Sequence, residues 1–145
     1  MRGAAGALRV GMDLVSIDEV AESVRRFGDR YLERIYTPHE IDTCRRRPVA
    51  DGNSDALIAR SLAARFAAKE AVMKVLRPVG VQLDWRSIEV HQMTGGWCEI
   101  RLSGQAAAMA AESGIDELVV SLTHEVSTAG AVVVGQCMTS ERGEV

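Results

Sequence analysis

Hydrophobic and polar positions follow two different periods along this chain, and each change of period marks a predicted element. Residues 8–15 (LRVGMDLV) are rich in apolar and branched side chains and predict a buried strand that carries one acid, Asp13. Apolar residues then recur at a helical spacing over residues 17–27, between an S-x-x-E capping sequence and Gly28. The chain therefore opens with a strand followed by a helix.

The next stretch of the pattern predicts further helices. A short helical piece, RYLERIY, precedes Thr37-Pro38-His39-Glu40, a second capping box with proline at the first helical position. That helix should stop before Pro48. After the turn-prone segment PVADGNSD, Asn53 or Ser54 can cap a long helix that runs to about Leu76.

The last third of the chain returns to a strand pattern. SIEVHQM and WCEIRL flank Thr94-Gly95-Gly96 and predict a hairpin, and an alanine-rich helix follows at residues 104–113. ELVVSLTHE and TAGAVVVGQ are two further strand candidates. The order β-α-α-α-β-β-α-β-β predicts an α+β fold in which a mainly antiparallel sheet packs against the long central helix.

Composition limits the number of domains and the kinds of partner. With 145 residues, of which 47% are hydrophobic, the chain can form one core, so residues 1–145 are expected to be a single domain. Residues 1–7 and 138–145 are expected to be flexible ends. The 17 basic and 20 acidic residues give a net charge of −3, which provides no general attraction to nucleic acid or to an anionic membrane.

Cysteine spacing and the absence of targeting signals indicate a cytoplasmic protein. The three cysteines, Cys44, Cys98 and Cys137, form no CxxC pair and have no zinc-ligand spacing, which fits a reducing compartment. The N-terminal sequence lacks the apolar run of a signal peptide, and no stretch approaches the ~20 apolar residues of a membrane span. No G-x-G-x-x-G or Walker A sequence is present, so a Rossmann or P-loop enzyme is not expected.

The long predicted helix contains charges on faces that should be buried. In SLAARFAAKEAVMK, residues 61–74, the side chains of Arg65, Lys69, Glu70 and Lys74 are spread among apolar neighbours, so no wholly polar face remains for solvent. An ionised group inside a packed element costs several kcal/mol unless it is paired or binds a metal. The helix therefore needs an explanation for its charges.

Two explanations fit the spacing, and both remain open at this point. Structurally, Glu70 could pair with Lys74 one turn later, and Asp13 could pair with Arg65 or Lys69. Functionally, Asp13 and Glu70 could hold a hard divalent cation while the bases receive phosphates, because Mg²⁺ typically takes one or two carboxylates plus water and phosphate oxygens. The first explanation predicts that these charges only stabilise the fold, whereas the second predicts a binding site for a divalent cation and phosphate.

Two other features allow a structural or a functional interpretation. His124 ends an apolar strand, where histidine is more often a hydrogen-bonded structural residue than a ligand. Residues 25–47 are rich in arginine, which fits solvated helix ends or a docking surface for an acidic protein. The arginines of this segment are Arg25, Arg26, Arg30, Arg34, Arg45, Arg46 and Arg47.

Three motifs together resemble one family. GMDLV, RFAAKEAVMK and VSLTHE, in this order and separation, resemble the holo-[acyl-carrier-protein] synthase type of 4′-phosphopantetheinyl transferase, and TPHEID resembles that family's T-x-x-E-L helix start. The resemblance covers residues 8–135. It implies transfer of the phosphopantetheine arm of coenzyme A to a serine of an acyl carrier protein, with release of adenosine 3′,5′-bisphosphate. It also implies a homotrimer with active sites at subunit interfaces.

The resemblance implies roles for the charged residues of the helix and the first strand. Asp13 and Glu70 would be the magnesium ligands and, together with Lys74, the catalytic residues. Lys74 would lie on the coenzyme A diphosphate, with Lys69 supporting the same charge. The further coenzyme A contacts implied are Arg65 and His124, at the 3′-phosphate end.

The sequence departs from the family pattern at two functional positions. Glu19 stands where some relatives place an arginine that binds the carrier protein, so docking would rest on Arg25 and Arg26. The hairpin has Gly96-Trp97-Cys98 where relatives commonly have Gly-x-Pro, which changes the wall near the pantetheine arm.

Two rival functions belong to other classes. A non-catalytic coenzyme A-binding module would be expected to have lost an acid or a lysine, yet Asp13, Glu70 and Lys74 are all present. A basic interaction domain would bind an acidic protein or RNA without magnesium, and that binding would survive removal of Glu70.

Overall fold

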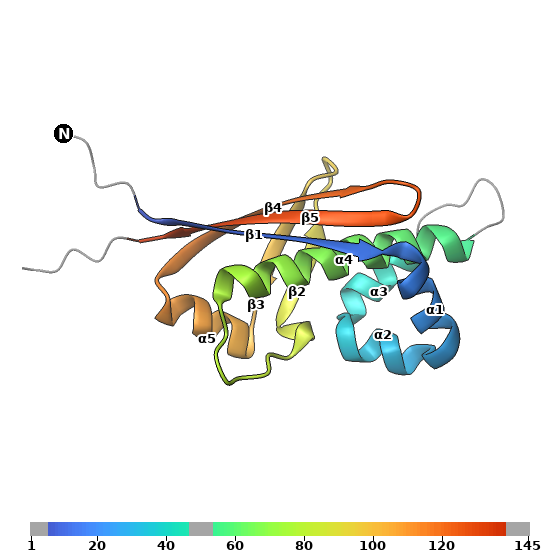
Figure 1. Ribbon diagram of the computed structural model, residues 1–145, viewed down its shortest axis with the longest axis horizontal. Coiled ribbons are helices and arrows are strands. Elements are labelled where there is room, and N and C mark those ends of the chain that lie inside the picture. Colours follow the sequence, from blue (N-terminus) through green and yellow to red (C-terminus); the bar gives the residue numbers. More distant parts are fainter. Residues whose placement is uncertain (1–5, 47–53, 139–145) are drawn as a thin grey trace, which may run out of the picture.

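The computed structural model describes residues 6–46 and 54–138 of this chain (Figure 1). The predicted α+β order is confirmed, and the short piece after the first helix forms a helix of its own. In chain order the elements are β1 (Leu8–Ser16), α1 (Ile17–Phe27), α2 (Asp29–Ile35), α3 (Pro38–Arg45), α4 (Ser54–Leu76), the 3₁₀ turn η1 (Trp85–Ser87), β2 (Ile88–Gln92), β3 (Cys98–Leu102), α5 (Gly104–Glu112), β4 (Ile115–His124) and β5 (Thr128–Cys137).

The strands form two antiparallel sheets. One has the order β1-β5-β4, and the other is the predicted hairpin β2-β3. Helix α4 runs along the three-stranded sheet beneath β1 and β5, while α1, α2 and α3 lie together near its N-terminal half (Figure 1). The sheet register pairs Asp13 with Ala131 on β5, which places the acid in the second half of an edge strand.

Helix starts follow the predicted caps where the structure describes them. The Ser16 side chain accepts a hydrogen bond from the Glu19 backbone N–H at 3.3 Å. Thr37 and Glu40 form the full reciprocal capping box at the start of α3, which ends at Arg45. The predicted cap at Asn53 and the stop signal at Pro48 lie outside the described residues.

The predicted flexible ends fall largely on residues 1–5 and 139–145, which lie outside the described residues. Just inside these limits the chain is hydrogen-bonded. The Cys137 N–H donates to the Ala7 carbonyl at 2.8 Å, and the Met138 N–H donates to the Gly114 carbonyl at 2.8 Å. The first and last described residues therefore lie at the same end of the paired strands β1 and β5.

Strand β1 has two faces of different character. Arg9 and Gly11 point toward α4, since the Arg9 guanidinium donates to the Val75 carbonyl at 3.1 Å and a Cβ on Gly11 would meet α4. The alternate side chains point away from α4 and are 61–68% exposed. These outward residues are Leu8, Val10, Met12 and Leu14.

Helix α4 forms the centre of the core. Six of its apolar residues have no exposed surface and let the sheet, α1 and the β2-β3 hairpin approach closely. These fully buried apolar positions are Ala63, Ala67, Ala68, Ala71, Val72 and Val75. Within residues 6–46 and 54–138, no helix combines the length and the apolar character that crossing a membrane requires.

Candidate active site

Gly11 sets the distance between β1 and α4. A Cβ atom built on Gly11 would overlap the backbone carbonyl oxygen of Ala71 and would lie 3.1 Å from the Cβ of Lys74. Only a glycine therefore lets the strand approach the helix this closely. Because side chains alternate along a strand, Asp13, two residues later, lies on the same face and also points toward α4. The G-x-D spacing thus brings a carboxylate against the helix.

Lys74 joins the helix to the strand at this point. Its Nζ lies 2.7 Å from the Met12 carbonyl oxygen and 3.2 Å from Asp13 Oδ1. The structural explanation of the sequence paired Lys74 with Glu70, and Asp13 with Arg65 or Lys69. The partner expected for Asp13 is wrong, because the ammonium of Lys74, and not Arg65 or Lys69, pairs with it.

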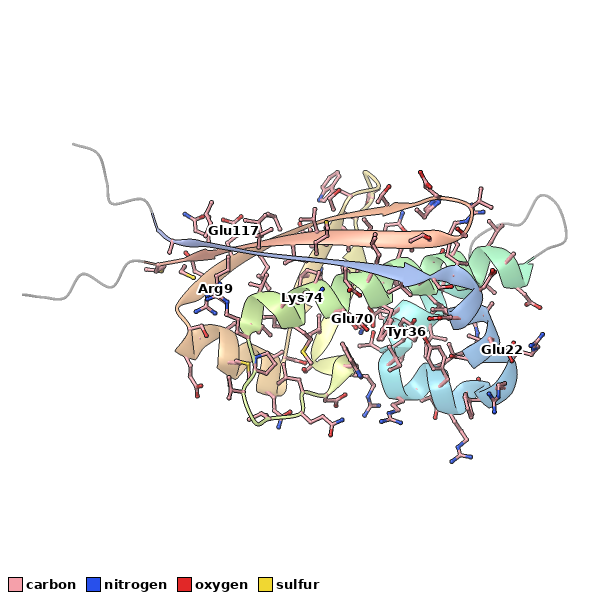
Figure 2. All side chains as sticks on the ribbon, in the orientation of Figure 1. Arg9, Glu22, Tyr36, Glu70, Lys74 and Glu117 are labelled. Atoms are coloured by element: carbon pink, nitrogen blue, oxygen red, sulfur yellow. The ribbon has the colours of Figure 1, made fainter. Side chains whose placement is uncertain are left out.

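Glu70 approaches the same carboxylate from the helix. Figure 2 shows Glu70 and Lys74 on α4 below β1. The pKa of Glu70 is raised from its ordinary value of 4.5 to about 7, chiefly by burial and then by the hydrogen bond and repulsion from Asp13, while Lys74 opposes these effects. Two carboxylates and one ammonium therefore meet between β1 and α4.

The two carboxylates fit a hard divalent cation. Asp13 Oδ2 is buried and has no hydrogen-bond partner within the part of the chain that the structure describes. A cation held by this oxygen and by Glu70 would relieve both the unpaired acceptor and the repulsion. Among the described residues no group of three or more His, Cys, Asp or Glu could hold a metal. Two carboxylates are a donor set that fits Mg²⁺, because this ion typically takes one or two protein carboxylates and fills its other positions with water and phosphate.

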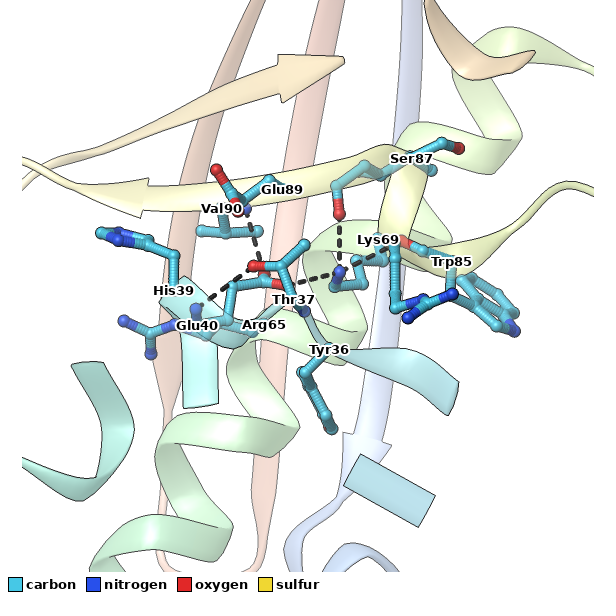
Figure 3. Close-up of polar contacts among 12 residues, drawn as sticks. Tyr36, Thr37, His39, Glu40, Arg65, Lys69, Trp85, Ser87, Glu89 and Val90 are labelled. Carbon is cyan, nitrogen blue, oxygen red and sulfur yellow. Dashed lines mark hydrogen bonds and ion pairs between the residues drawn. The ribbon is translucent and has the colours of Figure 1, made fainter. Parts of the chain in front are cut away.

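Lys69 lies on a different side of the helix from Lys74. Its side chain has no exposed surface, and its Nζ lies 2.6 Å from Glu40 Oε1 (Figure 3). The sequence assigned Lys69 to the diphosphate charge, but the ammonium does not reach the surface where an anion would bind. Burial lowers the pKa of Lys69, and the Glu40 carboxylate opposes that shift.

Sequence reasoning missed Glu40 as more than a helix cap. The capping box correctly predicted its backbone role, and the same carboxylate also reaches Lys69 on α4. Two features of the sequence could have indicated this ion pair. One is the capping acid Glu40, and the other is Lys69, a lysine in a later helix that has no wholly polar face. Spacing within one helix cannot reveal such a partner.

Arg65 and His124 are not brought to the Asp13 group within one chain. Arg65 precedes Lys69 by one turn and shares its side of α4, with 5% of its surface exposed. Its Nη1 donates to the Ser61 carbonyl at 3.2 Å, and its Nε has no partner within the described residues. His124 is exposed at the end of β4, which is separated from β1 by β5.

Arg25 and Arg26 are exposed on the last turn of α1. Arg25 forms an ion pair with Glu22 one turn earlier. The Arg26 guanidinium lies 5.3 Å from the centre of the Phe27 ring, and Phe27 is 53% exposed. Beside Arg25, α1 and the start of α4 enclose a surface hollow of about 660 Å³ that does not include Asp13, Glu70 or Lys74.

This arrangement of acids and lysine on a strand and a helix coincides with a family match over most of the chain. The model described as the 4′-phosphopantetheinyl transferase superfamily matches residues 9–129. The chain belongs to this superfamily. Two curated relatives, each named holo-[acyl-carrier-protein] synthase, show the same extent of similarity. The relative from Moorella thermoacetica is 38% identical, with 94% of this chain and 99% of that protein covered, and the relative from Herpetosiphon aurantiacus is 40% identical, with 88% and 98% covered.

Solved structures of proteins of this family superpose on most of this chain. A Chronobacterium ammoniagenes ACPS–CoA complex gives a TM-score of 0.78 at 29% identity and covers 92% of this chain and 99% of that chain. Helicobacter pylori holo-[acyl-carrier-protein] synthase in complex with coenzyme A gives a TM-score of 0.72 at 30% identity and covers 88% and 100%. The chain is therefore a transferase of this superfamily with the complete fold of these relatives.

Proposed function

We propose that this chain transfers the 4′-phosphopantetheine arm of coenzyme A to a serine of an apo acyl carrier protein and releases adenosine 3′,5′-bisphosphate. The observation that carries the proposal is the meeting of Asp13, Glu70 and Lys74 between β1 and α4. Membership of the superfamily, and two similar structures named as coenzyme A complexes, support this choice of donor.

The chemistry matches these residue types. The serine hydroxyl loses its proton to solvent, and its oxygen forms a bond to the phosphorus that bears the pantetheine arm. The bond from that phosphorus to the bridging oxygen breaks, and the electron pair leaves with the nucleotide product as negative charge. Such a displacement needs neutralised charge and an aligned nucleophile more than covalent help from the protein. Mg²⁺, when bound by Asp13 and Glu70, would neutralise diphosphate charge. Lys74 has three N–H donors and two partners among the described residues, so the third can meet a phosphate oxygen.

Transfer of the phosphopantetheine arm is tested by mass spectrometry of the carrier protein. The chain is incubated with coenzyme A, Mg²⁺ and a panel of apo carrier proteins from fatty acid and polyketide synthesis, and each carrier is weighed for the added arm. Glu70→Gln is the matched control, because it keeps the shape of the side chain and removes the charge. We expect one class of carrier to gain the arm with the wild-type chain and none to gain it with Glu70→Gln.

The two rival functions, a non-catalytic coenzyme A-binding module and a basic interaction domain, predict other results in the same experiment. A non-catalytic coenzyme A module would bind coenzyme A and leave every carrier unmodified. An interaction domain would bind its acidic partner equally well with Glu70→Gln and without Mg²⁺.

A homotrimer is the second part of the proposal. The outward face of β1 has four apolar side chains that are 61–68% exposed, and Val119 on β4 and Val132 on β5 extend the exposed apolar surface. Contiguous exposed apolar surface of this kind marks an interaction site. The expected occupants are further copies of this chain.

Assembly is tested by sedimentation velocity. Met12→Glu places a charge within the outward face of β1 and should yield monomers that have lost transferase activity. Val126→Glu is the control, because Val126 is 93% exposed in the β4-β5 turn. A Met12→Glu chain that still sediments as a trimer would contradict this assembly.

The carrier protein is proposed to dock on α1, where Arg25 and Arg26 are exposed beside Phe27. A cytoplasmic location stays a prediction from the cysteine content.

A further inference from the structure

Glu40 and Lys69 form an ion pair from which solvent is excluded. Neither side chain has any exposed surface, and the Lys69 Nζ lies 2.6 Å from Glu40 Oε1. Charges taken out of water cost several kcal/mol each unless every donor and acceptor is matched. The pair therefore has to be examined atom by atom.

Every polar atom of the pair has a partner. Glu40 Oε1 also accepts the Thr37 backbone N–H at 2.9 Å, and Oε2 accepts the Val90 N–H at 3.1 Å. The Lys69 ammonium donates its other two protons to the carbonyls of Trp85, at 3.1 Å, and Ile88, at 2.6 Å. Figure 3 shows these contacts converging on the Lys69 Nζ and the Glu40 carboxylate.

The contacts attach α4 to three separate pieces of backbone. Glu40 lies in the first turn of α3, Trp85 lies in η1, and Ile88 and Val90 lie in β2. All of them lie on the side of α4 that carries Lys69. Lys69 thus ties α4 to η1 and β2 by two hydrogen bonds and to Glu40 by the ion pair, and Glu40 is itself held by the N–H groups of Thr37 and Val90. These contacts restrict both the rotation of α4 about its axis and its position along that axis.

The side of α4 that faces β1 carries Glu70 and Lys74. Glu70 follows Lys69 directly and is turned from it by about 100° around the helix. It meets Asp13, while Lys74, one turn later, reaches the same strand. Any rotation of α4 that moved Lys69 relative to η1 and β2 would move the Glu70 carboxylate relative to Asp13.

We propose that Glu40 and Lys69 are positioning residues for the two-carboxylate site. They hold α4 from the side opposite β1, so that Glu70 stands where it can share one divalent cation with Asp13. This inference rests on the proposed function for the role of the cation. It assigns the lysine of the K-E-A sequence to the placement of its neighbour rather than to direct contact with the donor.

The experiment compares Lys69→Met with wild type and measures cation affinity as well as turnover. Methionine matches the four-atom apolar stem of the lysine side chain and removes the ammonium. Mn²⁺ is titrated into the variant and followed by electron paramagnetic resonance, because free Mn²⁺ gives a signal and bound Mn²⁺ does not. Partners that orient a metal ligand typically contribute about 10–100-fold to metal affinity. We expect the Mn²⁺ Kd of Lys69→Met to rise by about that factor, with kcat lowered at saturating coenzyme A.

The matched control is Leu62→Ala, which removes a buried side chain from the same face of α4 two turns earlier. It should lower the melting temperature and leave the Mn²⁺ Kd of the folded protein unchanged. If Lys69→Met behaves like Leu62→Ala, with a lower melting temperature and normal Mn²⁺ affinity, the pair is structural only and the proposal is overturned.

A second variant covers the case in which Lys69→Met fails to fold. Lys69→Met/Glu40→Gln removes both charges together, and the amide oxygen can still accept the Thr37 N–H. The same weakening of Mn²⁺ binding is expected, and unchanged binding overturns the proposal.

Wild-type transfer is measured in parallel. Absence of transfer by wild type would contradict the proposed function itself. Normal wild-type transfer together with unaffected variants would contradict only the positioning role.

Discussion

The Lys74 ammonium lies 3.2 Å from Asp13 Oδ1, although the two residues are 61 positions apart in the chain. The lysine side chain is 55% exposed, whereas that of Asp13 is 16% exposed. An ion pair with one such exposed partner stabilises a fold by less than about 1 kcal/mol. The position of Lys74 therefore matters for what binds beside it more than for holding the strand to the helix.

Lys74→Ala should separate these two roles. We expect kcat to fall by about 100-fold, because one donor to the developing phosphate charge is lost, while the melting temperature hardly changes. Steady-state kinetics with coenzyme A and a thermal melt provide the measurements. Unchanged kinetics with a lower melting temperature would return Lys74 to a structural role.

Arg65 and His124 should affect recognition of the donor, coenzyme A, rather than the reaction at phosphorus. If they bind the 3′-phosphate, Arg65→Ala and His124→Ala should each reduce the preference for coenzyme A over 3′-dephospho-coenzyme A, with a smaller effect on kcat than Lys74→Ala. The comparison needs kcat and KM for both donors. A variant that discriminates between the donors as well as wild type does would remove that residue from the 3′-phosphate site.

The raised pKa of Glu70 predicts a pH dependence of stability in the metal-free protein. Because its folded-state pKa of about 7 exceeds the ordinary value of 4.5, the folded state binds more protons than the unfolded state between these values. The contribution of this group to stability therefore falls as pH rises from about 4.5 to about 7 and stays low above that.

Glu70→Gln should remove that fall, because glutamine does not titrate. In EDTA, thermal melts should show the variant to be more stable than wild type above pH 7, with the difference shrinking toward pH 4.5. Added Mg²⁺ should raise the melting temperature of wild type above pH 7 and leave Glu70→Gln unaffected. Identical pH profiles for the two proteins would show that Glu70 does not titrate as described.

Gly11→Ala tests the close approach of β1 to α4. The new Cβ would overlap the Ala71 carbonyl, so the helix must move away, at a cost of about 1–3 kcal/mol. Asp13 and Glu70 would then separate, and Mn²⁺ affinity should fall together with stability.

The control for this change is Gly135→Ala on β5, whose Cβ would lie 2.7 Å from Val75 Cγ1 in the last turn of α4, one residue beyond Lys74. It should reduce stability to a similar degree and leave Mn²⁺ affinity near that of wild type. Equal losses of metal affinity in the two variants would argue against a local effect of Gly11.

Reversal of charge on α1 tests the docking surface. Arg26 lies beside the exposed Phe27, whereas Arg25 is already paired with Glu22. We therefore expect Arg26→Glu to weaken binding of an acidic carrier protein more than Arg25→Glu, with little change in coenzyme A affinity. Both effects should shrink as salt is raised, which surface plasmon resonance can follow. Equal weakening of carrier and coenzyme A binding would contradict docking on α1.

Sequence patterns were sufficient for the elements, because helix and strand periods, caps and glycine turns are local. The structure reproduces the first helix as residues 17–27 and the hairpin around Gly95 and Gly96. The meeting of Asp13 and Glu70 was one of two explanations that the spacing left open, and the family resemblance favoured it.

The partners of the lysines could not be inferred, for a physical reason. On a helix, spacing within the sequence shows which residues share a face but not which element covers that face. Lys69 and Lys74 are both one turn from other charged residues, yet one faces Glu40 in α3 and the other faces Asp13 in β1. The difference depends on tertiary contacts between distant segments.

Strand β1 has its site acid on one face and its exposed apolar residues on the other, which restricts how this segment can evolve. A single-residue insertion or deletion within residues 8–16 would exchange the two faces. The carboxylate would then stand among the outward apolar positions, and Met12 or Leu14 would stand against α4. Insertions and deletions are therefore expected in the connecting loops rather than in β1. Substitutions in β1 should be those that keep its alternation of inward and outward side chains.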